Sequence, residues 1–356
     1  MIKNRTFLLI AANILLAMFI MLNLESEESS EISLKDEFSE MISQMQLIEF
    51  RKPVSKQKIV LKKNKIDWEI TDPISWPAEP IALANLISKV SHLEAEFIGF
   101  LGELESKGEI PQDYGFDVNS SSSHILSKTS EIKITIGSLT RDQEGYFILV
   151  ENGNSATIWH TPRHFQDLIN RPLNEWARMT FFELPIYSID KFKVKEIIEE
   201  QKEITTSLSK IGDKWLFSLP FNNDANDDEM RSLLHKLMTT KIIGFAESDS
   251  DKNLTQAMEI EVEAMDNQFS FKFYKSSEQE TSKLLVKSNY HSHFEQDFYI
   301  RSEFLEHFKN LSMKLREKRL FSLDIDTVHR IRVFEGNSSL SLRKNDDNSR
   351  IIIVLS

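Results

Sequence analysis

The chain has 356 residues, of which 40% are hydrophobic and 28% are charged, a mix typical of globular proteins rather than disordered ones. Its formal net charge of −12 repels nucleic-acid phosphates, which argues against DNA or RNA binding. The absence of cysteine excludes disulfides, thiol nucleophiles, thiolate zinc sites and lipid attachment at a cysteine.

The N-terminal segment has the pattern of a membrane anchor. Lys3 and Arg5 precede an uncharged, mostly apolar run over residues 7–24, and acidic residues follow it from Glu25 onward. A helix of that length spans about 27 Å at ~1.5 Å per residue, close to the hydrocarbon thickness of a bilayer. Positive residues precede the run and none follows closely, so we expect a single-pass anchor in a bacterial inner membrane. The N-terminus would be cytoplasmic and the bulk of the chain periplasmic. The alternative is a cleaved signal peptide, although the run does not end in the small residues typical of a cleavage site.

Residues 25–46 are acidic and rich in serine, and they predict a stalk that leads into the folded part of the chain. A short helical pattern of apolar residues runs through its second half. Strands are expected to begin near Leu47.

An internal repeat is the most informative signal in the rest of the sequence. Trp68 and Trp215 each precede a proline by five residues, at an offset of 215 − 68 = 147. A helix-like segment follows each proline. Phe-Ile-Gly-Phe then occurs at 97–100 and Ile-Ile-Gly-Phe at 242–245. Two independent pairs of matching segments therefore occur in the same order in both copies.

Each copy is predicted to open with two strands, pass through a helix and continue as alternating strands. The predicted strands of the first copy span 58–63, 67–71, 131–136, 146–151 and 156–160, with a helix over 79–92 and a short one after Pro162. Those of the second span 259–263, 270–274, 283–287 and 298–301, with a helix over 302–318. Asn152-Gly153 is a strong hairpin signal between two of these strands.

Towards the end of the chain the offset becomes 139, as between Val194 and Val333. Residues 323–356 resemble the start of a third copy, and we expect this terminal hairpin to complete the sheet of the second copy. The predicted fold class is α+β, with an N-terminal transmembrane helix before two tandem repeats of a mostly antiparallel sheet with one or two helices each. The predicted parts are a cytoplasmic tip and anchor (1–24), stalk (25–46), first unit (47–190), second unit (191–322) and terminal hairpin (323–356).

Several short motifs occur in a fixed order. They are Trp-x4-Pro, a helix, Tyr-Gly-Phe-Asp at 114–117, Ile-Gly at 136–137, Gly-Tyr-Phe-Ile-Leu-Val at 145–150 and Leu-Arg-Glu-Lys-Arg-Leu-Phe at 315–321. Together they resemble the bacterial envelope family known as domain of unknown function 4340, over roughly residues 47–330. The resemblance implies one N-terminal membrane span and an accessory role beside an ABC-type transporter and a gliding-motility-like auxiliary subunit. It implies no catalytic residues, and the first copy departs from the last motif with Leu-Asn-Glu-Trp at 173–176.

Two histidine pairs have spacings that could supply metal ligands. His160 and His164 are four residues apart, but Pro162 between them indicates a strand end rather than one continuous helix face. His291 and His293 could share a strand face, but they lie in a polar segment that predicts a solvated loop. We expect no metal site at either pair.

Two further features have structural explanations that we prefer. The acidic segment Asp224–Glu229 could suggest calcium, but it lacks the glycine and terminal glutamate of a calcium loop, and acidic residues favour a helix start. Trp68 and Trp215 could stack on a ligand, but their recurrence at the same point of each copy predicts core packing.

The sequence contains no nucleophile elbow, no phosphate-binding loop and no His-Glu-x-x-His motif. We therefore expect a non-catalytic, membrane-anchored interaction protein with no cofactor, no metal and no catalytic residue, and the family resemblance implies that it is associated with an ABC-type transporter. The alternatives are an extracytoplasmic module that binds a glycan, peptide or lipid in a cleft between the copies, and a hydrolase with unfamiliar motifs.

Overall fold

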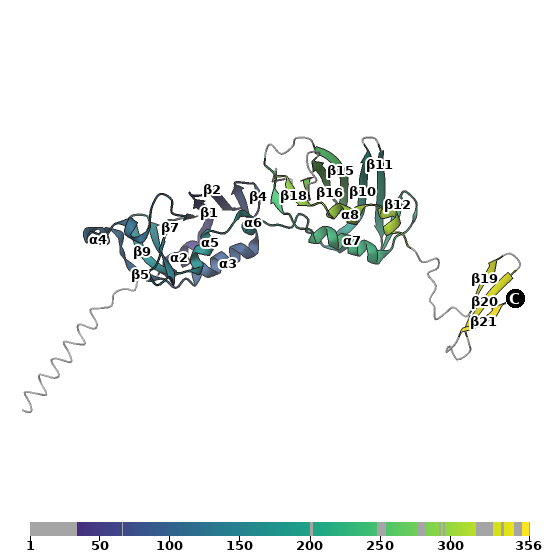
Figure 1. Ribbon diagram of the computed structural model, residues 1–356, viewed down its shortest axis with the longest axis horizontal. Helices are drawn as coiled ribbons and strands as arrows, with labels where there is room; N and C mark the ends of the chain where they lie inside the picture. The colour runs from purple at the N-terminus through teal and green to yellow at the C-terminus, as the bar shows by residue number, and fades with distance from the viewer. Residues whose placement is uncertain are drawn as a thin grey trace, which may run out of the picture. The chain divides into compact units, whose positions relative to one another are not determined.

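The computed structural model describes residues 34–65, 67–199, 202–247, 254–276, 282–291, 293–294, 296–317, 330–335, 338–344 and 351–355. The predicted anchor and the first part of the predicted stalk, residues 25–33, lie outside these residues, whereas the rest of the predicted stalk forms α2 and the start of β1. Within the described ranges, no helix has the length and apolar character needed to cross a membrane. The described part is mostly β with few helices (Figure 1).

The chain forms two compact units. The first comprises the described residues of Met1–Glu183, Met238–Gln256 and Phe271–Phe304, and the second those of Leu184–Leu237, Ala257–Ser270 and Leu305–Ser356.

The first sheet has nine antiparallel strands in the order β4-β3-β2-β1-β6-β7-β8-β9-β5. Its strands are β1 (Met45–Lys52), β2 (Gln57–Lys63), β3 (Trp68–Asp72), β4 (Trp76–Pro77), β5 (Glu96–Phe100), β6 (Ser122–Ser127), β7 (Glu131–Leu139), β8 (Gly145–Asn152) and β9 (Ser155–Pro162). Its helices are α2 (Leu34–Gln44), α3 (Pro80–Ser91), α4 (Leu101–Ser106), the 3-10 turn η1 (Pro111–Tyr114), α5 (His164–Ile169) and α6 (Leu173–Trp176).

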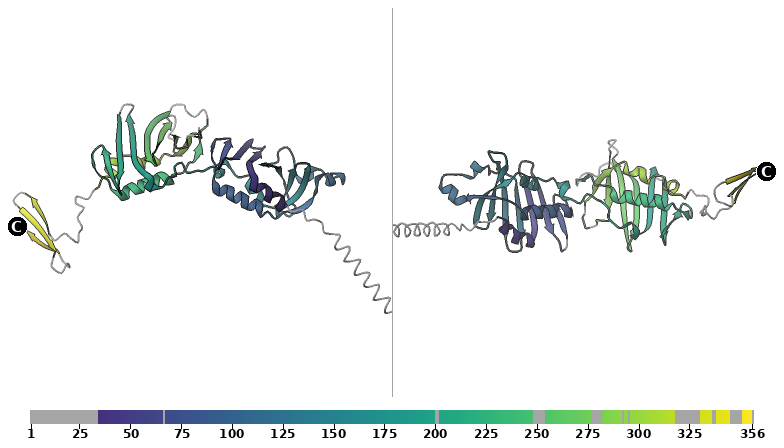
Figure 2. Two further views of the ribbon diagram at one scale, coloured as in Figure 1. Left: turned by 180° about the vertical axis from the view of Figure 1, so that it is seen from behind. Right: turned by 90° about the horizontal axis from the view of Figure 1, so that it is seen from below.

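Helix α3 shows how local sequence and packing agree in this sheet. Pro80 occupies the first turn, where a missing N–H costs nothing, and the Glu79 carboxylate accepts a hydrogen bond from the backbone N–H of Ile81. The buried face of the helix carries Ala82, Leu83, Leu86 and Val90. Because α3 spans Pro80–Ser91, the predicted helix over 79–92 is confirmed. Helices α2, α3 and α5 lie along one face of the sheet (Figures 1 and 2).

The second sheet repeats the first strand by strand, in the order β13-β12-β11-β10-β15-β16-β17-β18-β14. Its strands are β10 (Ile189–Glu199), β11 (Lys202–Ile211), β12 (Lys214–Leu219), β13 (Asn223–Asp224), β14 (Gly244–Phe245), β15 (Leu254–Ala264), β16 (Asn267–Ser276), β17 (Lys283–Ser288) and β18 (Phe298–Arg301). The 3-10 turn η2 (Ile186–Ser188) precedes it, and α7 (Asp227–Thr239), α8 (Phe304–Phe308) and α9 (Leu311–Lys314) accompany it.

The same backbone contacts recur in both sheets. The N–H of Ala78 donates to the carbonyl of Trp68 at 3.0 Å, and the N–H of Ala225 donates to the carbonyl of Trp215 at 2.9 Å. The next residue in each copy donates to a carbonyl far along the chain, that of Trp176 or Leu315, at 2.7 Å in both cases. Two similar antiparallel sheets thus carry the repeat that the sequence suggests.

Two expectations about the later elements were wrong. The helix expected over 302–318 is two short helices, α8 and α9, because Asn310 between them adopts a left-handed backbone with φ of 55°. The described strands of the terminal segment do not pair with the second sheet. Strands β19 (Arg330–Glu335), β20 (Ser338–Lys344) and β21 (Ile351–Leu355) pair with one another in a separate three-stranded sheet, the terminal sheet, while all nine strands of the second sheet precede residue 302.

Candidate functional site

Strand β5, at the edge of the first sheet, exposes three large apolar side chains. Phe97, Ile98 and Phe100 are 37%, 37% and 36% exposed, and we call them the β5 edge patch. In the described part of the chain, β5 pairs with β9 on one side and with no strand on the other. A hydrophobic strand with an open edge is a site where another chain can pair, and native proteins usually block such edges.

Aromatic packing holds the β5 edge patch in place. The ring of Phe97 packs edge-on against Trp159 at 5.1 Å and against Phe100 at 5.4 Å, measured between ring centroids. Trp159 is buried, and its indole N–H donates to the hydroxyl of Thr157 at 2.9 Å. The exposed ring of Phe97 therefore packs on a buried side chain, and it loses little conformational entropy when a partner binds.

A hollow adjoins the β5 edge patch, and the chain segment after β5 shapes it. The hollow has a volume of about 480 Å³ and is lined by Phe100, Leu101, Gly102, Glu105, Asn154, Ser155 and Ala156. Leu104 and Phe116 pack with Leu149 and Ile158, which lie opposite each other on β8 and β9. Residues from the segment 101–120 thus cover part of this sheet.

The motif residues of this segment have structural roles. A Cβ on Gly115 would lie 2.4 Å from the backbone nitrogen of Ser138, and one on Gly137 would lie 2.3 Å from the carbonyl oxygen of Tyr114. The two backbones therefore cross at a separation that only glycine allows. Burial and a hydrogen bond to Glu109 raise the pKa of Tyr114 to about 12, so this phenol stays protonated and does not act as a base near neutral pH.

The matching edge of the second sheet is covered. Ile242, which aligns with Phe97, is 3% exposed, and its N–H donates to the carbonyl of Met179 at 2.7 Å. Thr180 forms an antiparallel bridge with Lys241, whose ammonium donates to the Thr180 hydroxyl at 2.9 Å. An extended segment of the chain thus lies where the first sheet, as described, has an open edge.

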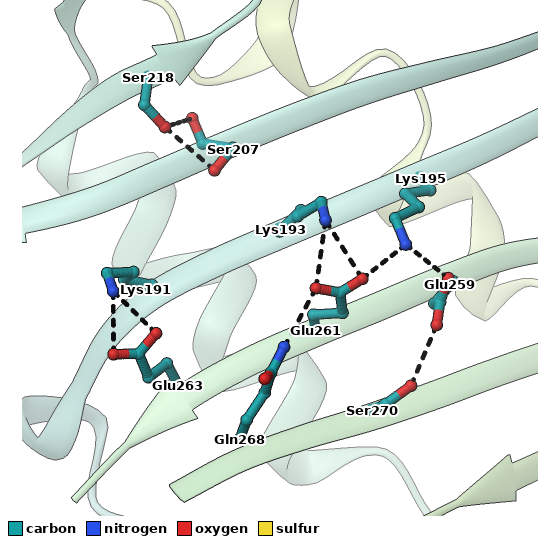
Figure 3. Close-up of polar contacts among 10 residues, drawn as sticks. All are labelled: Lys191, Lys193, Lys195, Ser207, Ser218, Glu259, Glu261, Glu263, Gln268 and Ser270. Atoms are coloured by element: carbon teal, nitrogen blue, oxygen red, sulfur yellow. Dashed lines mark hydrogen bonds and ion pairs between the residues drawn. The ribbon is translucent and has the colours of Figure 1, made fainter. Parts of the chain in front are cut away.

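The second sheet carries a lysine–glutamate ladder between β10 and β15 (Figure 3). It consists of Lys191, Lys193 and Lys195 on β10 and Glu259, Glu261 and Glu263 on β15. The closest contact joins the Lys195 ammonium to Glu261 at 2.6 Å, and the three directly opposed pairs lie at 2.9–3.2 Å. Alternating residues of both strands face the core, where Phe192, Val194, Ile260 and Val262 are buried.

The lysines and glutamates of the ladder form ion pairs with one another, and these pairs shift their pKa values. Burial alone would raise the pKa of Glu261, but hydrogen bonds from Lys195 and Lys193 outweigh it and lower the pKa. Hydrogen bonds to Glu261 and Glu259 raise the pKa of Lys195. The lowered pKa favours the ionised form of Glu261, and the opposed charges stabilise the pairing of β10 with β15.

The first histidine pair is not brought together as ligands. His160 lies on β9 with its ring 3.6 Å from the Glu96 carboxylate, while His164 starts α5 and is exposed. Pro162 ends β9 between them, as the sequence predicted. Among the described residues there is no cluster of three or more His, Asp or Glu side chains suited to a metal ion.

His291 lies among aromatic rings, and His293 is exposed. The His291 ring is 4.6 Å from Trp76 and 4.6 Å from Tyr290, measured between centroids. Burial, with a smaller effect of Arg178, lowers the pKa of His291 to about 4. The sequence missed this burial because its polar neighbours predicted a solvated loop.

The acidic segment before α7 caps that helix. The Asn226 side-chain oxygen accepts hydrogen bonds from the N–H groups of Asp228 and Glu229, and the Asp227 carboxylate accepts one from the N–H of Trp215. Trp215 is buried as expected for a core residue, whereas Trp68 is only partly buried.

Two hollows in the second unit were not foreseen from the sequence. One, of about 370 Å³, is lined by Ile186, Tyr187, Lys210, Asp213, Trp215, Asp227 and Arg231. The other, also about 370 Å³, lies between α7 and the pair α8–α9 and is lined by Glu229, Ser232, Leu233, His235, Lys236, His307, Leu311, Lys314 and Leu315. The first gathers residues from three segments between positions 186 and 231, the second joins residues 229–236 to residues 307–315, and no local motif marks either grouping.

Residues 68–257 match the family model described as domain of unknown function DUF4340. The chain belongs to this family. The DUF4340 match begins at Trp68 in β3 and ends within β15, so it includes the β5 edge patch, the crossing at Gly137 and the lysines of the ladder. No curated protein and no solved structure matches the chain significantly.

Proposed function

We propose that this DUF4340 protein is a non-catalytic, membrane-anchored extracytoplasmic accessory protein that binds another envelope protein through the β5 edge patch. The observation that carries the proposal is the contrast between two corresponding edges. The edge beside Ile242 is covered by an extended segment of the chain, whereas its counterpart at Phe97 exposes apolar side chains. A strand edge of this kind binds partners by β-strand addition.

The covered edge indicates the chemistry of the partner. The segment beside it, residues 179–182, is Met-Thr-Phe-Phe, which is extended and apolar and carries no charge. A partner segment of similar character would satisfy the free backbone groups of β5 and cover the rings of Phe97 and Phe100. We propose that it belongs to an ABC-type permease or its auxiliary subunit, as the family resemblance implies.

Location follows from the same proposal. The apolar run over residues 7–24, with Lys3 and Arg5 before it, would hold the protein in the inner membrane with the sheets outside the cytoplasm. That arrangement would keep the β5 edge patch within reach of the extracytoplasmic loops of a transporter.

Site-specific photo-crosslinking in cells tests this proposal. Benzoylphenylalanine is placed at Ile98 in the β5 edge patch or, as a control, at Val54, which is 81% exposed in the β1–β2 turn of the same unit. Adducts of the full-length protein are identified by mass spectrometry. We expect position 98 to capture a permease or auxiliary subunit and position 54 to capture neither. Equal capture at both positions, or no transporter component at position 98, would overturn the proposal.

A second function, binding of a small extracytoplasmic ligand, is favoured by the hollow beside Tyr187. Helix α2 precedes the first sheet, whereas only the 3-10 turn η2 precedes the second. Tyr187 in this turn is 77% exposed and lines the hollow. A volume of about 370 Å³ with an aromatic ring and charges of both signs suits a disaccharide or a dipeptide.

Calorimetric titration with chitobiose and with a charged dipeptide tests this second function. Saturable binding that is lost in Tyr187→Ala, and kept in Ile211→Ala as the exposed control, would support it. Absence of binding to both probes, or binding unaffected by Tyr187→Ala, would exclude the hollow as a site for these ligands.

A further inference from the structure

Among the described residues, the first strand of the terminal sheet, β19, differs from its counterparts in having a strand partner on one side only. Strand β1 lies between β2 and β6, and β10 lies between β11 and β15. In the described residues, β19 pairs with β20 alone. The order β19-β20-β21 otherwise matches the order β10-β11-β12.

The sequence of β19 follows that of β10 residue by residue at an offset of 139. Arg330 and Arg332 take the places of Lys191 and Lys193, while Ile331 and Val333 take those of Phe192 and Val194. Both strands therefore alternate cations on one face with apolar residues on the other.

The burial of the two strands differs sharply. On β10 the apolar positions are closed, since Phe192 is 0% exposed and Val194 is 1% exposed. On β19 the same positions are open, since Ile331 is 50% exposed and Val333 is 53% exposed. Aliphatic side chains left open along an unpaired strand edge mark a place for a further strand.

The strand that completes β10 defines the chemistry that fits β19. In β15, Ile260 and Val262 lie opposite Val194 and Phe192, and Glu261 and Glu263 lie opposite Lys193 and Lys191. A strand in the same register on β19 would place carboxylates against Arg332 and Arg330 and aliphatic residues against Val333 and Ile331. Opposite charges and matched apolar residues stabilise cross-strand pairs.

We infer that the edge of β19 accepts an antiparallel strand from another protein, in which glutamate or aspartate alternates with aliphatic residues. One position departs from β15. Phe334, 70% exposed, replaces Lys195, so the donated strand carries an apolar residue there instead of the carboxylate of Glu259. This site is separate from the β5 edge patch and does not depend on the function proposed for it.

A second copy of this strand is a poor occupant. Antiparallel pairing of two β19 strands that places Ile331 opposite Ile331 or opposite Val333 puts arginine opposite arginine, as Arg330 against Arg332 or Arg332 against Arg332. Like charges directly opposite destabilise a strand pair. An acidic strand has no such conflict, so charge complementarity selects it.

Fluorescence anisotropy with a labelled peptide tests the inference on the full-length chain in mild detergent. The probe is Ala-Met-Glu-Ile-Glu-Val-Glu-Ala, the sequence of residues 257–264. A peptide with the same composition in the order Ala-Met-Ile-Val-Glu-Glu-Glu-Ala lacks the alternation and is the control. We expect saturable binding of the probe, at least tenfold weaker binding of the control, and tighter binding when the first glutamate is replaced by leucine to face Phe334.

Charge reversal makes the test specific. The double variant Arg330→Glu, Arg332→Glu should weaken probe binding about tenfold or more, and a peptide with lysines at the second and third glutamate positions should recover it. Both arginines are exposed, so the variant leaves packed contacts intact. Equal binding of probe and control overturns the inference. Loss of binding on Lys193→Glu but not on the double variant does so too, because the peptide would then be displacing β15.

Discussion

The two nine-stranded sheets share one strand order yet differ on their surfaces. In the residues that the structure describes, the first is partly covered by the segment 101–120 and has no strand beyond β5, whereas the second covers the corresponding edge and displays the lysine–glutamate ladder. The shared features are strand order and the backbone contacts around Trp68 and Trp215. The differences lie in loops and exposed side chains, which is where binding functions usually lie. The comparison therefore directs experiments to the places where the copies diverge.

The largest expected loss of stability is at Trp76, and it distinguishes β4 from the corresponding strand β13. Trp76 in β4 is fully buried, packs against Phe298 at 5.6 Å between centroids and donates its indole N–H to the carbonyl of Arg178 at 2.7 Å. Its counterpart in β13, Asn223, is exposed. Trp76→Ala should lower the free energy of unfolding by about 3–5 kcal/mol, because it leaves a large cavity and an unpaired carbonyl.

Urea denaturation followed by circular dichroism measures this loss. Asn223→Ala is the matched control and should change the free energy of unfolding by no more than about 0.5 kcal/mol. Similar losses in both variants would mean that the two copies are equally dependent on this position, which contradicts the burial difference.

The next largest effect is a pH dependence centred on His291, whose segment has no counterpart in the tight β8–β9 turn. Its pKa is about 4 in the folded protein and 6.5 in the unfolded chain, so the unfolded state binds more protons between these values. Stability is therefore full above pH 6.5 and falls as the pH drops towards 4. The complete loss corresponds to about 3 kcal/mol.

Unfolding by urea at pH 7.5, 5.5 and 4.5 measures this dependence. His291→Phe keeps an aromatic ring among Trp76 and Tyr290 but cannot be protonated, so the part of the pH dependence caused by His291 should disappear. An unchanged profile in this variant would assign the acid sensitivity to other groups.

A smaller effect concerns the segment that covers the first sheet alone. Gly137→Ala would place a methyl group 2.3 Å from the Tyr114 carbonyl oxygen, and the backbone must move to accept it. We expect a loss of about 1–3 kcal/mol in the free energy of unfolding. Gly244→Ala is the control, since no atom lies within 4 Å of its added Cβ.

Local signals in the sequence were enough for much of the fold. The hairpin at Asn152-Gly153 and the start of α3 at Pro80 depend on residues within a few positions of each other, and both were predicted. The break at Asn310 was missed because apolar residues continue at helical spacing on both sides of it. The independence of the terminal sheet was also missed, since a hairpin pattern does not state which strand it joins.

The candidate surfaces were less accessible to sequence reasoning. Phe97, Ile98 and Phe100 were noted only as a repeat signal, because exposure at a sheet edge depends on which strand is last in the order. The lysine–glutamate ladder joins strands some 65 residues apart, so neither strand predicts it alone. The Trp215 core role was predicted because recurrence in both copies is visible in the sequence.

The smallest expected effect distinguishes pairs within the ladder, a feature of the second sheet. Glu261 has a side chain 16% exposed and contacts both Lys193 and Lys195, whereas Glu263 is 41% exposed and contacts Lys191. Double-mutant cycles with alanine should give a coupling free energy of about 0.5–1 kcal/mol for Lys195 with Glu261, and about 0.2–0.5 kcal/mol for Lys191 with Glu263. Salt at 1 M should reduce the second coupling more than the first, because exposed charges are screened more strongly. If the two couplings were equal and equally sensitive to salt, partial burial would not be strengthening the centre of the ladder. Its contribution would then be limited to opposing a one-residue slip of β15, which would turn the glutamates to the face of the sheet opposite the lysines.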